Sequence, residues 1–409
     1  MDRDSAAVDQ RGDALWGQAA RRFWRLDPRW LSVNHGSFGA APRPVLAAQA
    51  GWRRRMEARP GQFFRRELAP ALRAAAGRLA GFLGAEAQDL GFVANATEGC
   101  NAVLRSFDLR AGDEVLVLDH GYAAVRNAVR HVAARAGARV TEAALPFPRP
   151  DPAAIVAAVA GALTPRTRLA VIDHITSPSA LVLPLAEIVA ACHAAGAAVL
   201  VDGAHGPGQV TLDLKSLGAD WYVGNCHKFL CAPKGCGFLW AAPDRQAGLH
   251  PAVISHGYAR GFAAEFDWTG TRDPSAFLAV PAALDFLAGL GGTALLARNT
   301  RLAAAAGALL AARLGTETGS TGPLGGPTGG PIGGAMATVR LPSPGLATSG
   351  LGTAEHAAAV QERLLDARAD APVHAIGGAL WLRVSAHAYN EIGDYERLGE
   401  VLARILRAR

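Results

Sequence analysis

Between about residues 90 and 241, short apolar runs alternate with amphipathic segments. The runs have the length of strands, and the segments between several of them place apolar residues at helical spacing. The strand-like runs are GFVAN (91–95), DEVLVLDH (113–120), RLAVIDHITS (168–177), AAVLVDGAH (197–205), DWYVGN (220–225) and GCGFLWA (235–241). Helices are expected at 122–136 and 184–195. Strands separated by helices of this length form βαβ units, so the pattern predicts an α/β fold with a mainly parallel sheet.

Helical patterns dominate outside this segment. Residues 49–84 indicate a helix, a break and a second helix, and an Ala/Leu-rich stretch near 285–313 indicates one long helix. Residues 316–334 are Gly/Pro/Thr-rich and are predicted to form a flexible loop. We predict an N-terminal arm that packs with the small domain (1–44), a large domain (45–285) and a small α+β domain (286–409), which ends in a strand within 379–390 and a helix at 394–406.

Polar residues stand just after several of the apolar runs. They are Thr97, His120, Asp173, Asp202 and His205. In open α/β sheets, ligands bind beyond the carboxyl ends of the strands. We therefore expect these side chains to line one rim of one sheet.

Composition narrows the possible partners. The 409 residues are 50% hydrophobic and 19% charged, with a net charge of +6. The arginines are scattered over amphipathic segments without a basic block, so nucleic acid is not an expected partner. No apolar run approaches the roughly 18 residues of a membrane helix. The polar N-terminus carries no apolar leader, so we expect a cytoplasmic enzyme.

The five cysteines suggest no metal site. Cys226, Cys231 and Cys236 follow a C-x4-C-x4-C spacing, which is not usual for zinc. Together with Cys100 and Cys192 they are expected to be small buried residues. No metal is predicted.

Lysine is rare in this chain, which has only Lys215, Lys228 and Lys234. An enzyme that forms an imine must use lysine, because guanidinium cannot do so. Lys228 follows the apolar run 220–225, where burial would lower its pKa. Lys215 is expected on an exposed amphipathic segment and Lys234 in a turn.

Two further features fit a phosphorylated pyridine cofactor. Asp202 ends an apolar strand, where a carboxylate is costly unless it meets a cation such as a pyridinium; a turn or helix-cap aspartate is the alternative. The segment NATEGCN (95–101) opens a helix whose free amides, with the Thr97 hydroxyl, could bind phosphate. A plain capping box explains that segment equally well.

These elements occur in an order that resembles the class V aminotransferase family of fold-type I pyridoxal-phosphate enzymes, and within it isopenicillin N epimerase-like proteins. The resemblance spans most of residues 31–285. It rests on LSVNHGSFGAAPRPVL (31–46), PGQFFRREL (60–68), VANATEGCN (93–101), LDHGYAAVRNAV (118–129), VDGAHGPGQV (201–210), GNCHKFLCAPKGCGFLW (224–240) and FDWTGTRDPSAFL (266–278).

The resemblance implies a role for each matching residue. Lys228 would carry pyridoxal 5'-phosphate as a Schiff base, Asp202 would bind the pyridinium, and His205 would contact the phenolic oxygen. The phosphate would be held by Ala96, Thr97, Asn225 and His227. Tyr122 would stack on the ring, and Thr271 would reach the phosphate of a neighbouring subunit, which implies a homodimer with shared sites.

Substrate contacts follow from the same resemblance. Arg383 would clamp the α-carboxylate of an amino-acid substrate, and Asn34 and His35 are further candidates to bind the substrate by recognising its side chain. Cysteine desulfurases of the group carry a catalytic cysteine shortly before this arginine, but the stretch APVHAIGGALW (371–381) has none.

The leading hypothesis is therefore an epimerase-like enzyme acting at an amino-acid α-carbon. A C–S β-lyase, similar to hercynylcysteine sulfoxide lyases, and an aminotransferase remain open alternatives, because this fold supports all three reactions. A pyridoxal-phosphate-binding regulator is a fourth hypothesis, although no DNA-binding module is apparent.

Overall fold

The computed structural model describes residues 16–320, 334–342 and 352–407. Its central feature is a seven-stranded sheet in the order β2-β8-β7-β6-β5-β3-β4. Six of these strands run in the same direction, and β8 runs in the opposite direction. The strands are β2 (Leu90–Val93), β3 (Glu114–Leu118), β4 (Arg139–Ala143), β5 (Thr167–Asp173), β6 (Ala198–Gly203), β7 (Trp221–Asn225) and β8 (Gly237–Ala241). The prediction of an α/β fold with a mainly parallel sheet is confirmed.

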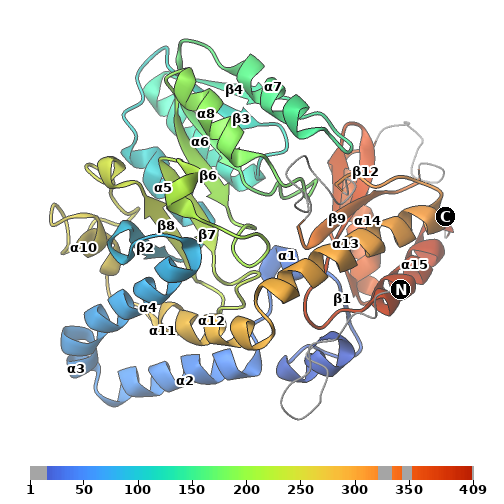
Figure 1. Cartoon of the computed structure of the whole chain (residues 1–409), viewed down its shortest axis with the longest axis horizontal. Helices are drawn as coiled ribbons and strands as arrows, with labels where there is room; N and C mark the ends of the chain where they lie inside the picture. Colours follow the sequence, from blue (N-terminus) through green and yellow to red (C-terminus); the bar gives the residue numbers. More distant parts are fainter. Residues whose placement is uncertain (1–15, 321–333, 343–351, 408–409) are drawn as a thin grey trace.

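Helices cover both faces of this sheet (Figure 1). Successive strand residues point to opposite faces, so Val115 and Val117 pack in one apolar core while Leu116 and Leu118 pack in another. The first core includes α5 (Ala96–Ser106) and α6 (Ala123–Ala136). The second includes α4 (Leu68–Leu83), α7 (Pro152–Ala162), α8 (Leu185–Ala194) and α12 (Val280–Gly289). Burial on both faces explains why these strands are nearly continuous apolar runs.

The C-terminal part has its own antiparallel sheet in the order β11-β12-β9. These strands are β9 (Met336–Arg340), β11 (Val373–Ile376) and β12 (Ala379–Ser385). Helices α13 (Thr293–Leu314), α14 (Ala354–Asp366) and α15 (Ile392–Arg407) share an apolar core with it. The N-terminal arm joins this part, because β1 (Leu31–Ser32) pairs with β10 (Ala369–Asp370).

Two helical predictions can be compared directly with the structure. The break expected within 49–84 is present, because α2 (Arg43–Ala58) ends before the short α3 (Pro60–Gln62) and a π-helical turn, η2 (Phe63–Glu67), which leads into α4. A long helix is present near 285–313 as expected, but the helical stretch is not continuous. It is divided into α12 and α13 at Gly291 and Gly292, whose φ values of +106° and +51° do not continue a helix.

The remaining elements are short. They are η1 (Gly17–Phe23), α1 (His35–Phe38), η3 (Ala87–Asp89), α9 (Leu214–Leu217), η4 (Pro243–Arg245), α10 (Phe262–Asp267) and α11 (Ser275–Leu278). Most of the Gly/Pro/Thr-rich loop predicted at 316–334 lies outside the described residues. Among the described residues, no single helix is long and apolar enough to span a membrane. One sharply bent pair of helical segments, Ser275–Gly289 and Thr293–Leu314, reaches the required length and apolar composition only when the two are counted together.

Candidate active site

Lys228 lies just beyond the end of β7, in the loop that leads back to β8, and only 9% of its surface is exposed. Burial and then the charge of Arg383 lower its pKa to about 7, and the charges of Asp202 and Asp173 oppose this shift. Its Nζ lies 3.2 Å from His205 Nε2. The structure thus gives Lys228 an amine that can lose its proton near neutral pH, as imine formation requires.

The other two lysines have different surroundings. Lys215 is exposed and forms an ion pair with Glu86. The Lys234 ammonium donates to the carbonyl of Gly39 at 3.1 Å in an exposed position. Neither is enclosed as Lys228 is.

Two buried carboxylates lie on neighbouring strands at the carboxyl end of the sheet. Asp202, near the end of β6, pairs in register with Asp173 at the end of β5, and the two residues are 3% and 5% exposed. Burial raises the pKa of Asp202, although the Ala204 amide and Lys228 counteract it. Burial and then the charge of Asp202 raise the pKa of Asp173 well above its usual range. A buried acidic pair of this kind favours a cationic group beside it, and a pyridinium nitrogen is such a group.

His205 adds a polar atom without a partner. Its Nε2 faces Lys228, whereas its Nδ1 is buried and makes no hydrogen bond. Burial holds the pKa of His205 well below its usual range, so the imidazole is neutral. A neutral imidazole with one free nitrogen can hydrogen-bond the ring oxygen of a pyridine cofactor.

The segment expected to hold the phosphate lies where α5 begins. Asn95 caps the helix, because its side chain accepts from the Glu98 amide at 3.0 Å. The same helix terminus could also attract an anion, so the structure is compatible with both the capping and the phosphate-binding interpretation. The Ala96 amide donates to Asn225 Oδ1 at 2.8 Å, and a direct bond from this amide to phosphate would require Asn225 to turn away. Thr97 opens the first turn beside it.

His227 borders the same region from the lysine loop. Its Nδ1 donates to the carbonyl of Cys236 at 2.8 Å, an assignment that leaves Nε2 as the acceptor. Burial is the main cause of the lowered pKa of His227. The hydrogen bond fixes the ring orientation at the edge of the cradle.

Arg383 of β12 is 2% exposed, and no carboxylate of the described residues forms an ion pair with it. Its Nη1 donates to the Ser177 carbonyl at 2.6 Å, and its Nη2 donates to Ser37 Oγ at 2.8 Å and to Asn34 Oδ1 at 3.3 Å. Nε is buried without a partner. Burial lowers the pKa of Arg383 to about 10, so the guanidinium stays charged and lacks a bonded anion. An amino-acid carboxylate would supply that anion.

The Asn34 side chain links Arg383 to the carboxylate of Asp370. Asn34 Nδ2 donates to Asp370 Oδ1 at 2.9 Å, while Asn34 Oδ1 accepts from both Arg383 and Ser37. The amide is therefore engaged on both sides. In this structure Asn34 orients the guanidinium, and a direct substrate contact would have to replace one of these bonds.

His35 was expected to contact substrate, but the structure places it behind the lysine loop. Its Nε2 donates to the Lys228 carbonyl at 3.0 Å, and its Nδ1 lies 3.0 Å from Tyr389 Oη. It is 3% exposed, and burial lowers its pKa to about 4. Both nitrogens are occupied, which corrects the expectation of a free substrate-binding histidine. The side chain instead fixes the backbone that carries Lys228.

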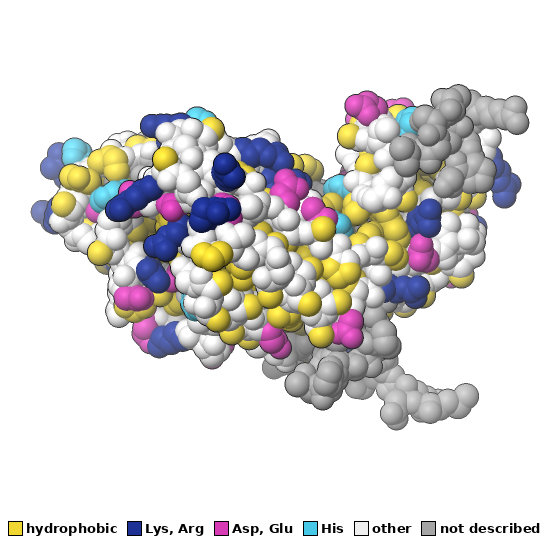
Figure 2. All heavy atoms as spheres, turned by 90° about the horizontal axis from the view of Figure 1, so that it is seen from above, with side chains coloured by type: hydrophobic (Ala, Val, Ile, Leu, Met, Phe, Trp, Pro, Cys, Tyr) yellow, Lys and Arg dark blue, Asp and Glu magenta, His cyan; other side chains and the backbone are white. Residues whose placement is uncertain are grey.

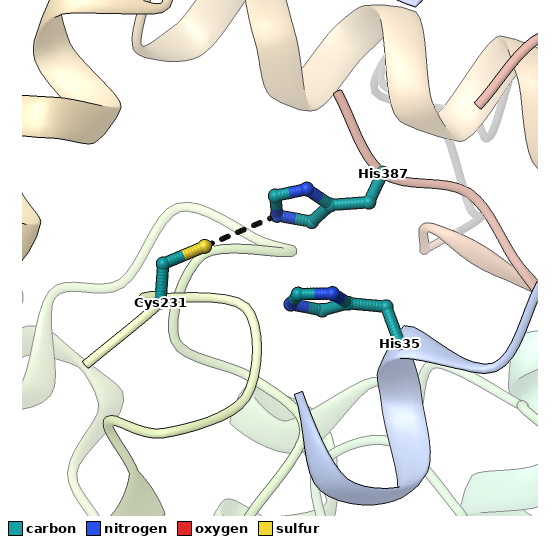
Figure 3. Close-up of side chains that lie close together, drawn as sticks. All are labelled: His35, Cys231 and His387. Atoms are coloured by element: carbon teal, nitrogen blue, oxygen red, sulfur yellow. Dashed lines mark hydrogen bonds between the residues drawn. The ribbon is translucent and has the colours of Figure 1, made fainter. Parts of the chain in front are cut away.

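A compact cluster of His35, Cys231 and His387 lies at this point (Figure 3). The possible ligand atoms of the three side chains lie within 4.8 Å of one another. However, the two imidazoles are stacked, with ring centroids 3.9 Å apart and an angle of 17° between their planes. Ring nitrogens bind metals in the plane of the ring at about 2 Å, so stacked rings do not converge on one ion. Cys231 Sγ and His387 Nε2 lie 3.4 Å apart and satisfy each other.

Tyr122 and Thr271 are more exposed. Tyr122 precedes α6, its amide donates to Asp173 Oδ1 at 3.3 Å, and its side chain is 44% exposed. Its expected stacking on the cofactor ring stays a prediction. Thr271 lies on an exposed loop between α10 and α11. Its expected contact with a neighbouring phosphate involves a second chain and stays a prediction.

Comparison with known proteins identifies the family. Residues 41–323 match the family model described as aminotransferase class-V. The chain belongs to the class V aminotransferase family. It is 37% identical over 405 residues to isopenicillin N epimerase of Amycolatopsis lactamdurans, covering 94% of this chain and 98% of that one. It is 39% identical over 307 residues to putative L-cysteine desulfhydrase 1 of Oryza sativa subsp. japonica, covering 70% and 64% of the two chains.

The fold also matches a solved structure. A mutant of C-DES with glycine covalently linked to its PLP cofactor superposes with a TM-score of 0.78 at 22% identity, covering 95% of this chain and 99% of that one. The class V chain is a pyridoxal 5'-phosphate enzyme, and the buried acidic pair, the free His205 nitrogen and the enclosed Lys228 fit that cofactor.

Sequence reasoning did not find every residue of the site. Ser177, Ser37 and Asp370 position Arg383, but short polar residues in loops carry no distinguishing signal. Asp173 was recognised only as a polar strand end. Its register opposite Asp202 was the information that the sequence lacked.

Proposed function

We propose that this class V enzyme acts at the α-carbon of an amino acid, and that its principal reaction is epimerisation. The observation that carries the proposal is the juxtaposition of Lys228 and Arg383. The adjacent residues Asn34 and His35 connect the two groups, because Asn34 Oδ1 accepts from Arg383 at 3.3 Å and His35 Nε2 donates to the Lys228 carbonyl at 3.0 Å. The charge of Arg383 also contributes to the lowered pKa of Lys228. Arg383 would bind the α-carboxylate, and the Lys228 amine would then stand where it can take the α-proton.

The roles of the remaining residues follow from their positions. The bound cofactor supplies an electron sink for the negative charge left by the α-proton. Asp202 would hold the ring protonated, with Asp173 adding to the negative field. His205 would contact the ring oxygen, and Thr97, Asn225 and His227 would hold the phosphate. We further propose a homodimer in which Thr271 of the partner subunit completes the phosphate site.

A C–S β-lyase is the second candidate, because a relative at 39% identity is named as an L-cysteine desulfhydrase. A lyase of the desulfurase type would need a reactive thiolate. All five cysteines of this chain are buried, and the sulfur of Cys231 is engaged with His387. A lyase reaction here would therefore release the sulfur group without transfer to a protein cysteine.

The test is incubation of the pure holoenzyme with a panel of L- and D-amino acids in deuterated water. The proposal predicts interconversion of the enantiomers with deuterium at the α-carbon. Release of pyruvate and sulfide from cysteine without racemisation would show that the enzyme catalyses β-elimination and not epimerisation. Stoichiometric keto-acid formation would indicate transamination, and no reaction with any amino acid would refute the proposed function.

A further inference from the structure

A cleft of about 390 Å³ opens beside the catalytic rim. Its walls come from two parts of the molecule, with His120, Tyr122, Arg126 and Ser177 on the rim of the large sheet and His374 on β11 opposite. Seen from above, the surface is hollowed between the large body and the smaller C-terminal lobe (Figure 2). Small-molecule sites typically occupy about 300–1,000 Å³, so the cleft can hold a substantial substituent.

The cleft begins where the substrate carboxylate would be fixed. Ser177, which lines it, accepts the hydrogen bond from Arg383. Tyr122 lines it as well, whereas Asp202, His205 and Lys228 do not. The cleft therefore continues outward from the substrate's α-carbon region and is separate from the residues that hold the ring.

Most polar side chains of the cleft are already hydrogen-bonded. His120 Nδ1 lies 2.8 Å from Ser179 Oγ. Arg126 donates to the Asp119 carbonyl at 2.9 Å and forms an ion pair with Glu142 at 2.5 Å. Asp119 Oδ1 accepts from two backbone amides, at 2.9 and 3.0 Å. The charges of the lining are thus compensated by the protein itself.

His374 is different. Its imidazole makes no hydrogen bond to the described residues, and its Nε2, like the Nε of Arg126, is buried without a partner. Burial, together with the charge of Arg383, lowers its pKa to about 3, so the imidazole is neutral. It also lies near enough to His205 to influence the titration of that ring. A buried unpaired nitrogen costs free energy unless a ligand satisfies it.

We propose that this cleft is the side-chain subsite of the enzyme, and that His374 selects amino acids whose long side chain carries an uncharged hydrogen-bonding group, such as an amide. A neutral imidazole can serve either the carbonyl or the N–H of an amide. The compensated lining gives no advantage to a charged group. A thiol as short as that of cysteine would leave most of the cleft unfilled. The inference rests on the proposed amino-acid chemistry at Lys228.

The test compares N5-ethyl-L-glutamine with L-norleucine, which has a chain of similar length without the amide, and with L-alanine. Dissociation constants are measured on the holoenzyme from the change in cofactor absorbance, and KM where turnover occurs. The wild-type enzyme should bind the amide at least about tenfold more tightly than norleucine, as expected for one hydrogen bond to an otherwise unpaired buried group. His374→Ala should abolish this preference and leave alanine binding unchanged.

Two further variants guard the interpretation. His374→Gln keeps a hydrogen-bonding side chain and should retain part of the amide preference. His131→Ala removes an exposed histidine from α6 and should change nothing. Tighter binding of alanine or norleucine than of the amide by the wild-type enzyme would overturn the subsite. An equal loss for all three ligands in His374→Ala would overturn the selective role of His374, and no spectral response to any amino acid would refute the proposed function itself.

Discussion

Replacement of Arg383 by lysine tests the substrate's orientation. The guanidinium is fixed by donors on two nitrogens, to Ser177 at 2.6 Å and to Ser37 at 2.8 Å, and its Nε is buried with no partner. Lysine keeps the positive charge but loses the planar, two-pronged geometry. We expect a loss of about 2–4 kcal/mol in amino-acid binding, the range seen when one partner of a buried, hydrogen-bonded charge pair is removed.

That loss corresponds to a rise in KM of roughly 30- to 1,000-fold. The assay is steady-state kinetics with amino acids, together with binding of simple amines that lack a carboxylate, which should be nearly unchanged. The absorbance of the resting cofactor should also be preserved. Arg340→Lys is the matched control, because Arg340 lies on the neighbouring strand, is 44% exposed and pairs with Glu317. Loss of cofactor from Arg383→Lys, or a wild-type KM, would refute the reasoning.

Two further predictions concern the lysine loop. Cofactor-free protein should gain about 1.4 kcal/mol of unfolding free energy per pH unit above about pH 7, because folded Lys228 releases its proton near pH 7 and unfolded lysine near 10.5. Denaturation at pH 7.5 and 8.5 should show that Lys228→Met lacks this contribution, and an identical pH slope in the variant would contradict it. Gly39→Ala should destabilise the protein by more than about 1–3 kcal/mol and weaken cofactor retention, because φ is +66° and a Cβ would lie 1.9 Å from the His227 carbonyl. Calorimetry against Gly61→Ala, which has open space around it, checks this, and equal melting temperatures would contradict it.

The central sheet was largely predictable because its strands are buried on both faces. Strands such as β5 and β6 contain apolar runs of four residues that are followed directly by aspartate. By contrast, β4 lies at the sheet edge with only Ala143 buried, so its sequence carries no strand pattern. The start of the long helix near 285–313 was misplaced because a pair of glycines interrupts apolar spacing that is otherwise continuous.

The site was predictable where chemistry restricts the residue type. Lysine is rare in this chain, and a carboxylate at a buried strand end has few explanations, so Lys228 and Asp202 stood out. The orientation of a side chain from a distant segment was not predictable. His35 is 193 residues from Lys228 in sequence, and only the fold shows that its ring faces the lysine's backbone carbonyl. Likewise, the free nitrogen of His374 appears only once β11 is placed opposite Tyr122.

Borohydride reduction of the holoenzyme followed by peptide mapping tests the central claim most directly. The reduced cofactor should be recovered on one peptide, with the label on Lys228, since this is the enclosed lysine with a pKa lowered to about 7. Lys228→Ala should take up no covalent label and lose turnover by several orders of magnitude, because the nucleophile and base are removed together. Recovery of the label on Lys215 or Lys234, or full turnover by Lys228→Ala, would contradict the account.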